Sequence, residues 1–249
     1  MDHAIDIRQL TVAYGAKPVL WNVDLQIPKD GMTGIVGPNG AGKSTLIKAI
    51  LGTVPTLSGE IKLHEEVSAT SDSIGYGPQR SSVDWDFPTT VFDLAMMGTY
   101  GRLKWFRRPG AREREQTWEA LRQVRMEDFA DRQIGELSGG QQQRLFIARA
   151  FVQQAQIYLM DEPFAGVDAK TETLLIEILH TLRDQGNTIV LVHHDLTTVA
   201  DYFDHVVLLD RQIIASGKTS ETFTSENIEA TYGVAGMQVS AASGNASDD

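Results

Sequence analysis

The stretch GPNGAGKST at Gly37–Thr45 constrains this chain more than any other feature. It satisfies the pattern GxxxxGK[ST] and stands between a short apolar run, Met32–Val36, and a helix-prone stretch, Lys43–Leu51. A strand, a glycine-rich loop and a helix in this order form a phosphate site, because backbone N–H groups and the helix N-terminus face the anion. We expect the phosphates to contact Gly37, Pro38, Asn39, Gly40, Ala41, Gly42, Lys43, Ser44 and Thr45, with Lys43 reaching the terminal phosphates and Ser44 offering its hydroxyl to Mg²⁺.

A second motif consists of an apolar run that ends in acids. Ile157–Asp161 has the sequence IYLMD, and Glu162 and Pro163 follow directly. Acids at strand ends are often only turn residues. Beside a phosphate loop, however, Asp161 is expected to hold magnesium through its water shell. Glu162, one residue further, is placed to act as general base for the water that attacks the γ-phosphate.

Composition narrows the class of protein. Of the 249 residues, 42% are apolar and 22% are charged, which is typical of a folded domain. There are no cysteines, so disulfides and thiolate metal sites are excluded. A net charge of −11 argues against nucleic acid as a partner. The apolar stretches Thr188–Val192 and Val206–Leu209 are far shorter than the roughly 20 residues of a membrane-spanning helix. The first ten residues do not resemble an export signal.

The order of apolar patterns predicts an α/β fold with a parallel core sheet, an N-terminal antiparallel β region and an inserted helical subdomain. Strands alternate with helices on both sides of a helical block, and the helix after Asp168 carries Leu174, Leu175, Ile178, Leu179 and Leu182 on one face. The predicted strands are Ile5–Val12, Leu20–Ile27, Met32–Val36, Gly59–Leu63, Ile74–Gly77 and the two runs IYLMD and TIVLV; the predicted helices of the block are Val91–Gly98, Ala111–Met126 and Gly140–Val152.

Leu137–Arg144, with the sequence LSGGQQQR, decides the class. Together with the two preceding motifs it resembles the ATPases of ABC transporters, and the resemblance covers nearly the whole chain. It implies ATP and Mg²⁺ as cofactors and a P-loop NTPase cassette. It also implies a head-to-tail homodimer in which the signature of one subunit closes over the ATP of the other. In isolation, the same residues would also suit a serine N-cap before a glycine-rich helix start.

The resemblance assigns roles to single residues. Tyr14 matches the aromatic residue that stacks on adenine, Gln79 the glutamine that senses magnesium, and His194 the switch histidine that contacts the γ-phosphate. His193 stands before it where many members have Thr or Ser. In FAGVD, Ala165 and Val167 replace the usual Ser and Leu. The residues expected to act across the dimer are Ser138, Gly139, Gly140, Gln141 and Asp168.

The segment from Ser82 to Pro109 resembles the subfamily that serves manganese, zinc and iron uptake, through VDWDFP, MMG and WFRRP. This implies integral membrane permease subunits, an extracytoplasmic metal-binding protein as an indirect partner, and a place at the cytoplasmic face of the plasma membrane. Manganese is the first choice, with zinc and iron as alternatives. Trp85, Phe87, Met96, Met97 and Trp105 are expected mostly to pack the subdomain, and the basic residues Arg102, Lys104, Arg107 and Arg108 face lipid headgroups or solvent.

We therefore predict one ABC ATPase domain at residues 1–237, with a catalytic core at 1–83 and 151–237 and a helical signature subdomain at about 84–150. Residues 238–249 are predicted to form a disordered tail. Two other classes stay open. A soluble ABC ATPase of translation or DNA repair would carry a second cassette or a long insertion, and a regulatory module without turnover would lose Glu162 or His194.

Overall fold

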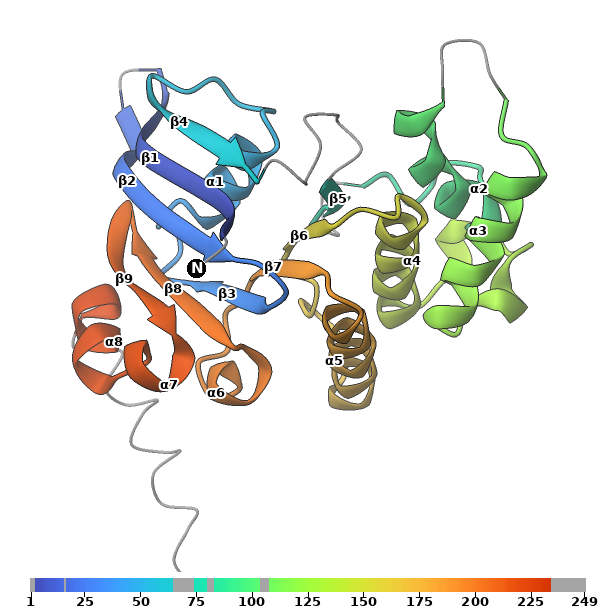
Figure 1. Cartoon of the computed structure of the whole chain (residues 1–249). Helices are drawn as coiled ribbons and strands as arrows, with labels where there is room; N and C mark the ends of the chain where they lie inside the picture. Colours follow the sequence, from blue (N-terminus) through green and yellow to red (C-terminus); the bar gives the residue numbers. More distant parts are fainter. Residues whose placement is uncertain (1–2, 16, 65–73, 80–82, 104–107, 234–249) are drawn as a thin grey trace, which may run out of the picture. The chain divides into compact units, whose positions relative to one another are not determined.

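A computed structural model describes residues 3–15, 17–64, 74–79, 83–103 and 108–233. The chain divides into two compact units, of which unit 1 contains residues 1–66 and 188–249, and unit 2 contains residues 67–187. The helices and strands of both units are labelled in Figure 1. Unit 2 is thus inserted into the sequence of unit 1. The predicted boundaries of the helical subdomain stay a prediction.

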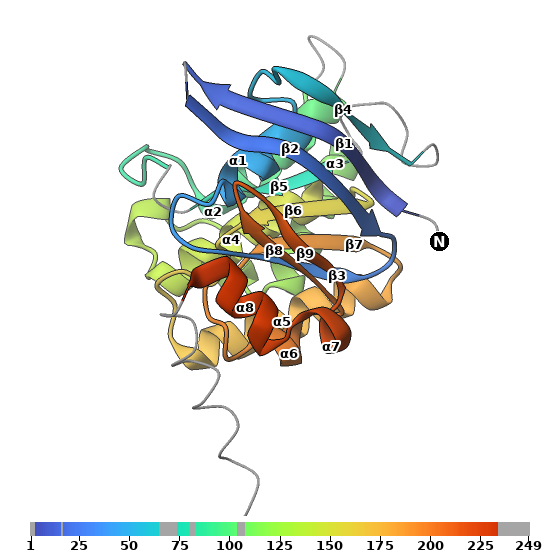
Figure 2. The ribbon, with the colours of Figure 1, turned by 90° about the vertical axis from the view of Figure 1, so that its left-hand side faces the viewer.

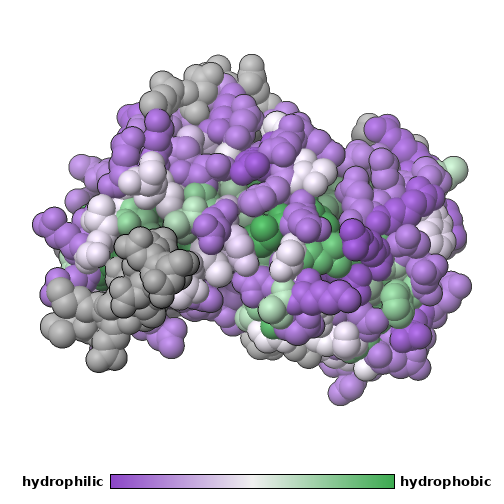
Figure 3. Space-filling view, turned by 90° about the horizontal axis from the view of Figure 1, so that it is seen from below, coloured by the Kyte–Doolittle hydropathy of each residue, from purple (hydrophilic) through white to green (hydrophobic). Residues whose placement is uncertain are grey.

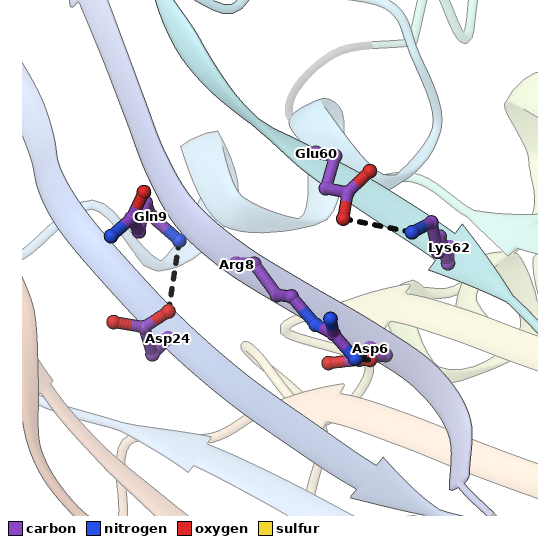
Figure 4. A network of polar contacts seen from close by, with 6 residues as sticks. All are labelled: Asp6, Arg8, Gln9, Asp24, Glu60 and Lys62. Carbon is purple, nitrogen blue, oxygen red and sulfur yellow. Dashed lines mark hydrogen bonds and ion pairs between the residues drawn. The ribbon is translucent and has the colours of Figure 1, made fainter.

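Unit 1 contains an antiparallel sheet in which β1 (His3–Tyr14) lies between β2 (Lys17–Pro28) and β4 (Ser58–Leu63). The predicted N-terminal antiparallel region is thereby confirmed, and β4 joins it. Ile5 and Ile7 are buried while the residues between and after them carry polar contacts (Figure 4): Arg8 pairs with Asp6 at 2.7 Å. This alternation is what one buried and one solvated face require.

Unit 1 also contains the strands around the phosphate loop. Strand β3 (Met32–Val36) pairs in parallel with β7 (Thr188–Val192) on one side and β8 (His205–Asp210) on the other. Every residue of β3 and β7 is buried, as expected for parallel strands. The helices of this unit are α1 (Lys43–Ile50), α6 (Val199–Tyr202), α7 (Thr219–Thr222) and α8 (Ser225–Tyr232).

The hairpin of β8 with β9 (Gln212–Lys218) was not predicted. Its turn places Arg211 at a φ of +58°, a conformation that sequence reasoning assigns to Gly or Asn rather than to Arg. Figure 2 shows this hairpin with α7 and α8 beside it. In unit 1, the strands β7, β3 and β8 therefore run parallel, whereas β9 runs antiparallel to β8.

Unit 2 contains the parallel pair β5 (Ile74–Gly77) and β6 (Ile157–Asp161) together with the helical block. Helices α2, α3 and α4 pack on one another through aromatic contacts such as Phe92 with Trp118, whose ring centroids lie 4.9 Å apart. The helices are α2 (Val91–Met96), α3 (Ala111–Gln123), α4 (Gly139–Val152) and α5 (Ala169–Asp184), with short 3₁₀ segments at Met97–Arg102, Glu127–Phe129 and Ile134–Glu136.

The helix predictions were confirmed with small differences. The first predicted helix changes to 3₁₀ geometry at Met97. On α5, Leu175, Leu179 and Leu182 are buried as predicted, but Leu174 and Ile178 are half-buried, and Ile176 is buried instead. Trp85 packs edge-on against Phe146, with 5.1 Å between ring centroids. In contrast, Phe87 leaves 54% of its surface exposed, so the packing expected of the aromatic segment holds only in part.

Three predictions fall on residues of which the structure says little. The tail at 238–249 lies outside the described residues, as do Lys104, Trp105 and Arg107. Arg102 lies in a 3₁₀ segment, but its side chain is likewise outside the description, whereas Arg108 is exposed.

Hydrophilic residues predominate on the face seen in Figure 3. Among the described helices, none combines the length and apolarity that crossing a bilayer requires.

Candidate nucleotide site

The predicted site residues all lie within the described ranges and divide between the two units. Unit 1 holds Tyr14, the phosphate loop and His194. Unit 2 holds Gln79, Asp161 and Glu162, the signature residues Ser138–Gln141, and Asp168. Hydrogen bonds join Lys43 to the phosphate loop, Gln79 to Glu162, and Ser138 to Gln141.

The phosphate loop connects buried strand β3 to helix α1. Lys43 folds back over the loop, and its Nζ donates to the carbonyl oxygens of Gly37 at 2.6 Å and Pro38 at 3.0 Å. Only 6% of Lys43 is exposed, so its charge is held at the loop and not in bulk solvent. The loop residue Ala41 is bound on its outer side, since Arg211 N–H donates to its carbonyl at 2.8 Å. The loop is thus preformed, with a cation at its centre.

Helix α1 begins without a capping side chain, because its N-cap residue is Gly42. Gly42 has a φ of +99°, and a Cβ there would lie 2.6 Å from Leu20 Cδ2, so only glycine fits. The first turn, Lys43–Leu46, contains no acidic residue that would neutralise the positive end of the helix dipole. No side chain therefore caps the N–H groups at this helix start, and no acid in its first turn would oppose an anion there.

Strands β5 and β6 bring Gln79 and Glu162 together at their carboxyl ends. Gln79 Nε2 donates to Glu162 Oε2 at 2.9 Å, although the residues lie far apart in the sequence. Glu162 has a φ of +55°, which is uncommon for a residue with a side chain and is typical of functional sites. Asp161, directly before it, is only 3% exposed. Its negative charge adds to burial in raising the pKa of Tyr76.

The signature residues form the start of α4 and bind one another. Ser138 Oγ accepts the Gln141 N–H at 3.4 Å, while Gln141 Oε1 accepts the Ser138 N–H at 2.8 Å, which is a capping box. The following Gln142 and Gln143 are buried, and Arg144 donates to the carbonyls of Val124 and Arg125. Within the octet, Ser138 is exposed and the three residues after it are half-buried, whereas Leu137, Gln142 and Gln143 are buried.

Asp168 caps helix α5. Its carboxylate accepts the Thr171 N–H at 3.0 Å and the Thr171 hydroxyl at 2.8 Å, and these bonds lower the pKa of Asp168. Thr171 also lies beside the signature, because a Cβ added to Gly140 would be 2.9 Å from Thr171 Cγ2. Sequence reasoning missed Thr171, although an Asp followed three residues later by a hydroxyl residue at a helix start could have indicated it.

Tyr14 and His194 are both exposed in unit 1. Tyr14 ends β1 and leaves 51% of its surface exposed, which suits stacking on a flat ring. His194 follows β7 and is exposed, whereas its neighbour His193 is buried. Sequence reasoning treated His193 only as a source of ambiguity, since nothing in a strand-end HHD sequence distinguishes the buried ring from the exposed one.

Metal and cavity geometry add two observations. The described residues include no group of three or more His, Asp or Glu side chains arranged to hold a metal ion. The candidate magnesium donors, Ser44, Gln79 and Asp161, all offer oxygen atoms, which is the chemistry that Mg²⁺ prefers. A groove of about 720 Å³ in unit 1 is lined by β1, β2, β3, β8, β9 and α7, and its lining contains none of the predicted site residues.

The sequence matches the family model described as ABC transporter over residues 20–165. It is 54% identical to the zinc transport system ATP-binding protein TroB of Treponema pallidum, covering 93% of this chain and 87% of the relative. It is 52% identical to the manganese transport system ATP-binding protein MntB of Bacillus subtilis, covering 92% of each.

Solved structures agree with this assignment. An inward-facing ABC transporter of the metal-chelate type aligns with a TM-score of 0.83 and 28% identity, covering 93% of this chain and 89% of that chain. The ADP conformation of an ATP-binding cassette aligns with a TM-score of 0.79 and 25% identity, covering 96% and 99%. The family match and these relatives span the phosphate loop, the signature and the acidic strand end, and the chain belongs to the ABC transporter family as an ATP-binding cassette.

Proposed function

We propose that this chain hydrolyses ATP to energise uptake of a transition-metal ion, with manganese as the first candidate. The observation that carries the proposal is the Gln79–Glu162 hydrogen bond, which holds a carboxylate beside buried Asp161 at the end of a strand. A carboxylate in that place suits a general base for an attacking water. A module without turnover has no use for a strained, oriented acid, so hydrolysis is favoured over simple ATP binding.

The proposed roles follow the two groups of residues. Gly37–Thr45 bind the phosphates through backbone N–H groups, and Lys43 neutralises the terminal phosphates. Tyr14 stacks on adenine, and His194 contacts the γ-phosphate. Ser44, Gln79 and Asp161 supply oxygen ligands to Mg²⁺, which when bound neutralises charge on the phosphates. Glu162 accepts the proton of the attacking water.

The helix start at the signature, of which Ser138 is exposed, supports a homodimer. Ser138, Gly139, Gly140 and Gln141 form a second helix start that one nucleotide in one subunit does not require. We place this start, with Asp168, over the ATP of a second copy. In this arrangement closure of two subunits on two ATP molecules moves the attached permease subunits, and hydrolysis reopens the dimer.

Ser138→Arg tests the dimer. A long cation at the exposed helix start should block nucleotide-driven dimerisation, while ATP binding to the phosphate loop stays within twofold of wild type. Size exclusion with ATP in a hydrolysis-deficient background measures the first, and titration with a fluorescent ATP analogue measures the second. Dimers that persist in Ser138→Arg would refute this use of the signature.

Glu162→Gln tests hydrolysis itself. The amide keeps the shape and the partner Gln79 but cannot accept a proton, so turnover should fall by about 10²-fold or more while ATP binding persists. Phosphate release should be measured with Mg²⁺, for the chain alone and with its permease. Unchanged turnover in Glu162→Gln, or no release by the wild type in either form, would reject the proposal.

The identity of the metal rests on the relatives. TroB is named for zinc and MntB for manganese, and further MntB proteins of Listeria monocytogenes and Listeria innocua each share 50% identity with this chain. A deletion strain supplied with manganese, zinc or iron separates the candidates. Rescue by zinc alone would overturn manganese and leave the ATPase proposal intact.

A further inference from the structure

Two adjacent histidines at the end of β7 have opposite environments. His194 is exposed, whereas His193 is 4% exposed and lies inside unit 1. The family resemblance gives a role to His194 alone. The burial of a second imidazole next to it therefore requires a separate physical account.

His193 is hydrogen-bonded to the loop that carries His194. Its Nε2 lies 2.7 Å from Thr198 Oγ1, and that hydroxyl donates to the Asp195 carbonyl at 3.2 Å. We assign the single proton of the threonine hydroxyl to its bond with the Asp195 carbonyl. In this assignment the hydroxyl accepts from His193, whose proton lies on Nε2. The imidazole thus closes the loop 193–198 from inside, with His194 between its two ends.

Ring contacts connect the same imidazole to the strand before the phosphate loop. His193 meets Phe203 edge-on at 5.3 Å, and Phe203 lies over β3, where a Cβ on Gly34 would be 2.8 Å from its ring. His193 N–H also donates to the Ile35 carbonyl at 3.0 Å. Strand β3 ends at Val36, directly before Gly37. The loop of His194 and the phosphate loop are therefore anchored to one strand.

A further bond within the loop limits its shape. Asp195 Oδ1 accepts both the N–H and the hydroxyl of Thr197, at 2.9 and 2.6 Å. This turn holds the half of the loop that follows His194. His193 adds a hydrogen bond to Thr198 within the same loop and an edge-on contact with Phe203, which lies over β3.

We propose that His193 is a positioning residue, which acts as a neutral hydrogen-bond donor to hold His194 at a fixed place relative to the phosphate loop. The proposal rests on the proposed hydrolysis of ATP. It assigns His193 no contact with nucleotide. Its effect passes through His194, and this route gives a test that a merely structural role would not satisfy.

Two pairs of variants carry the experiment. His193→Phe keeps an aromatic ring without the donor, and Thr198→Val removes the acceptor; each should lower kcat about tenfold while the KM for ATP changes less than twofold. His193→Gln keeps a nitrogen donor near the position of Nε2 and should recover part of kcat. Thr181→Val, an exposed threonine on α5, is the matched control and should leave kcat unchanged.

The decisive comparison uses His194→Ala as background. In that background His193→Phe and Thr198→Val should lower the residual kcat no further, because the side chain they position is absent. A further tenfold loss there, or wild-type kcat in both single variants, would overturn the proposal. Thr198→Val keeps the test valid if His193→Phe fails to bind the fluorescent ATP analogue. Absence of turnover in the wild type would instead refute the proposed function.

Discussion

The phosphate loop and the signature are both glycine-rich starts of a helix, but they are capped in opposite ways. The N-cap residue of helix α1 is Gly42, so no side chain caps the first N–H groups of this helix. Helix α4 begins at Ser138, whose hydroxyl and the Gln141 amide satisfy two N–H groups of the same start. The comparison teaches that α4 satisfies N–H groups at its start with its own side chains, whereas α1 has no side chain that does so.

Gly42→Ala tests the first half of the comparison and has the largest expected effect. Alanine at a φ of +99° is strained, and its Cβ would collide with Leu20. We therefore expect the free energy of unfolding to fall by about 3 kcal/mol. Affinity for a fluorescent ATP analogue should fall at least tenfold. Gly186→Ala, with a φ of +85° but nothing within 4 Å, is the matched control for strain alone. Equal loss of affinity in both variants would contradict a specific role of Gly42.

Acidic pH should lower the stability of the region around the phosphate loop and leave the stability of the signature helix α4 unchanged. Burial lowers the pKa of His193 to about 4, below the ordinary value of 6.5, while Asp195 opposes the shift. Between pH 4 and pH 6.5 the unfolded state therefore binds more protons at His193 than the folded state does. The free energy of unfolding is highest above pH 6.5 and falls as the pH drops toward 4. The expected loss is about 2 kcal/mol between pH 6.5 and 5.

The measurement is urea unfolding at both pH values, with hydrogen exchange to locate the loss. Protection should fall at residues 193–203, while the capping box of α4, which consists of neutral groups, should keep its protection. His193→Gln should flatten the pH dependence. A slope that is unchanged in this variant would show that other groups cause the acid sensitivity.

Ser138→Ala has the smallest expected effect and tests the second half of the comparison. Loss of the N-cap hydroxyl should lower the free energy of unfolding by about 1 kcal/mol and leave ATP binding by the isolated chain unchanged. Thermal unfolding with and without nucleotide measures both. Thr224→Ala removes the N-cap of α8, far from the signature in sequence, and should cost a similar amount. A Ser138→Ala variant as stable as the wild type would mean that the capping box contributes nothing measurable.

The sequence by itself determined the elements and motifs that depend on local order. GPNGAGKST predicts strand, loop and helix because glycine, lysine and hydroxyl spacing specify a phosphate loop within nine consecutive residues. Buried β3, β6 and β7 followed from continuous apolar runs, and the serine before α4 followed from N-cap chemistry. The family resemblance at Leu137–Arg144 depended on the same local order, and the comparisons confirmed it.

Only the tertiary structure decided which residues meet across distant parts of the chain. The Gln79–Glu162 bond depends on the register of β5 with β6, and the anchoring of His193 depends on Phe203 and β3, none of which a local pattern specifies. The β8–β9 hairpin turns at Arg211, whose left-handed conformation tertiary packing imposes on a residue without that preference. Two identical neighbours, His193 and His194, differ for the same reason, because burial is a property of the fold and not of the residue.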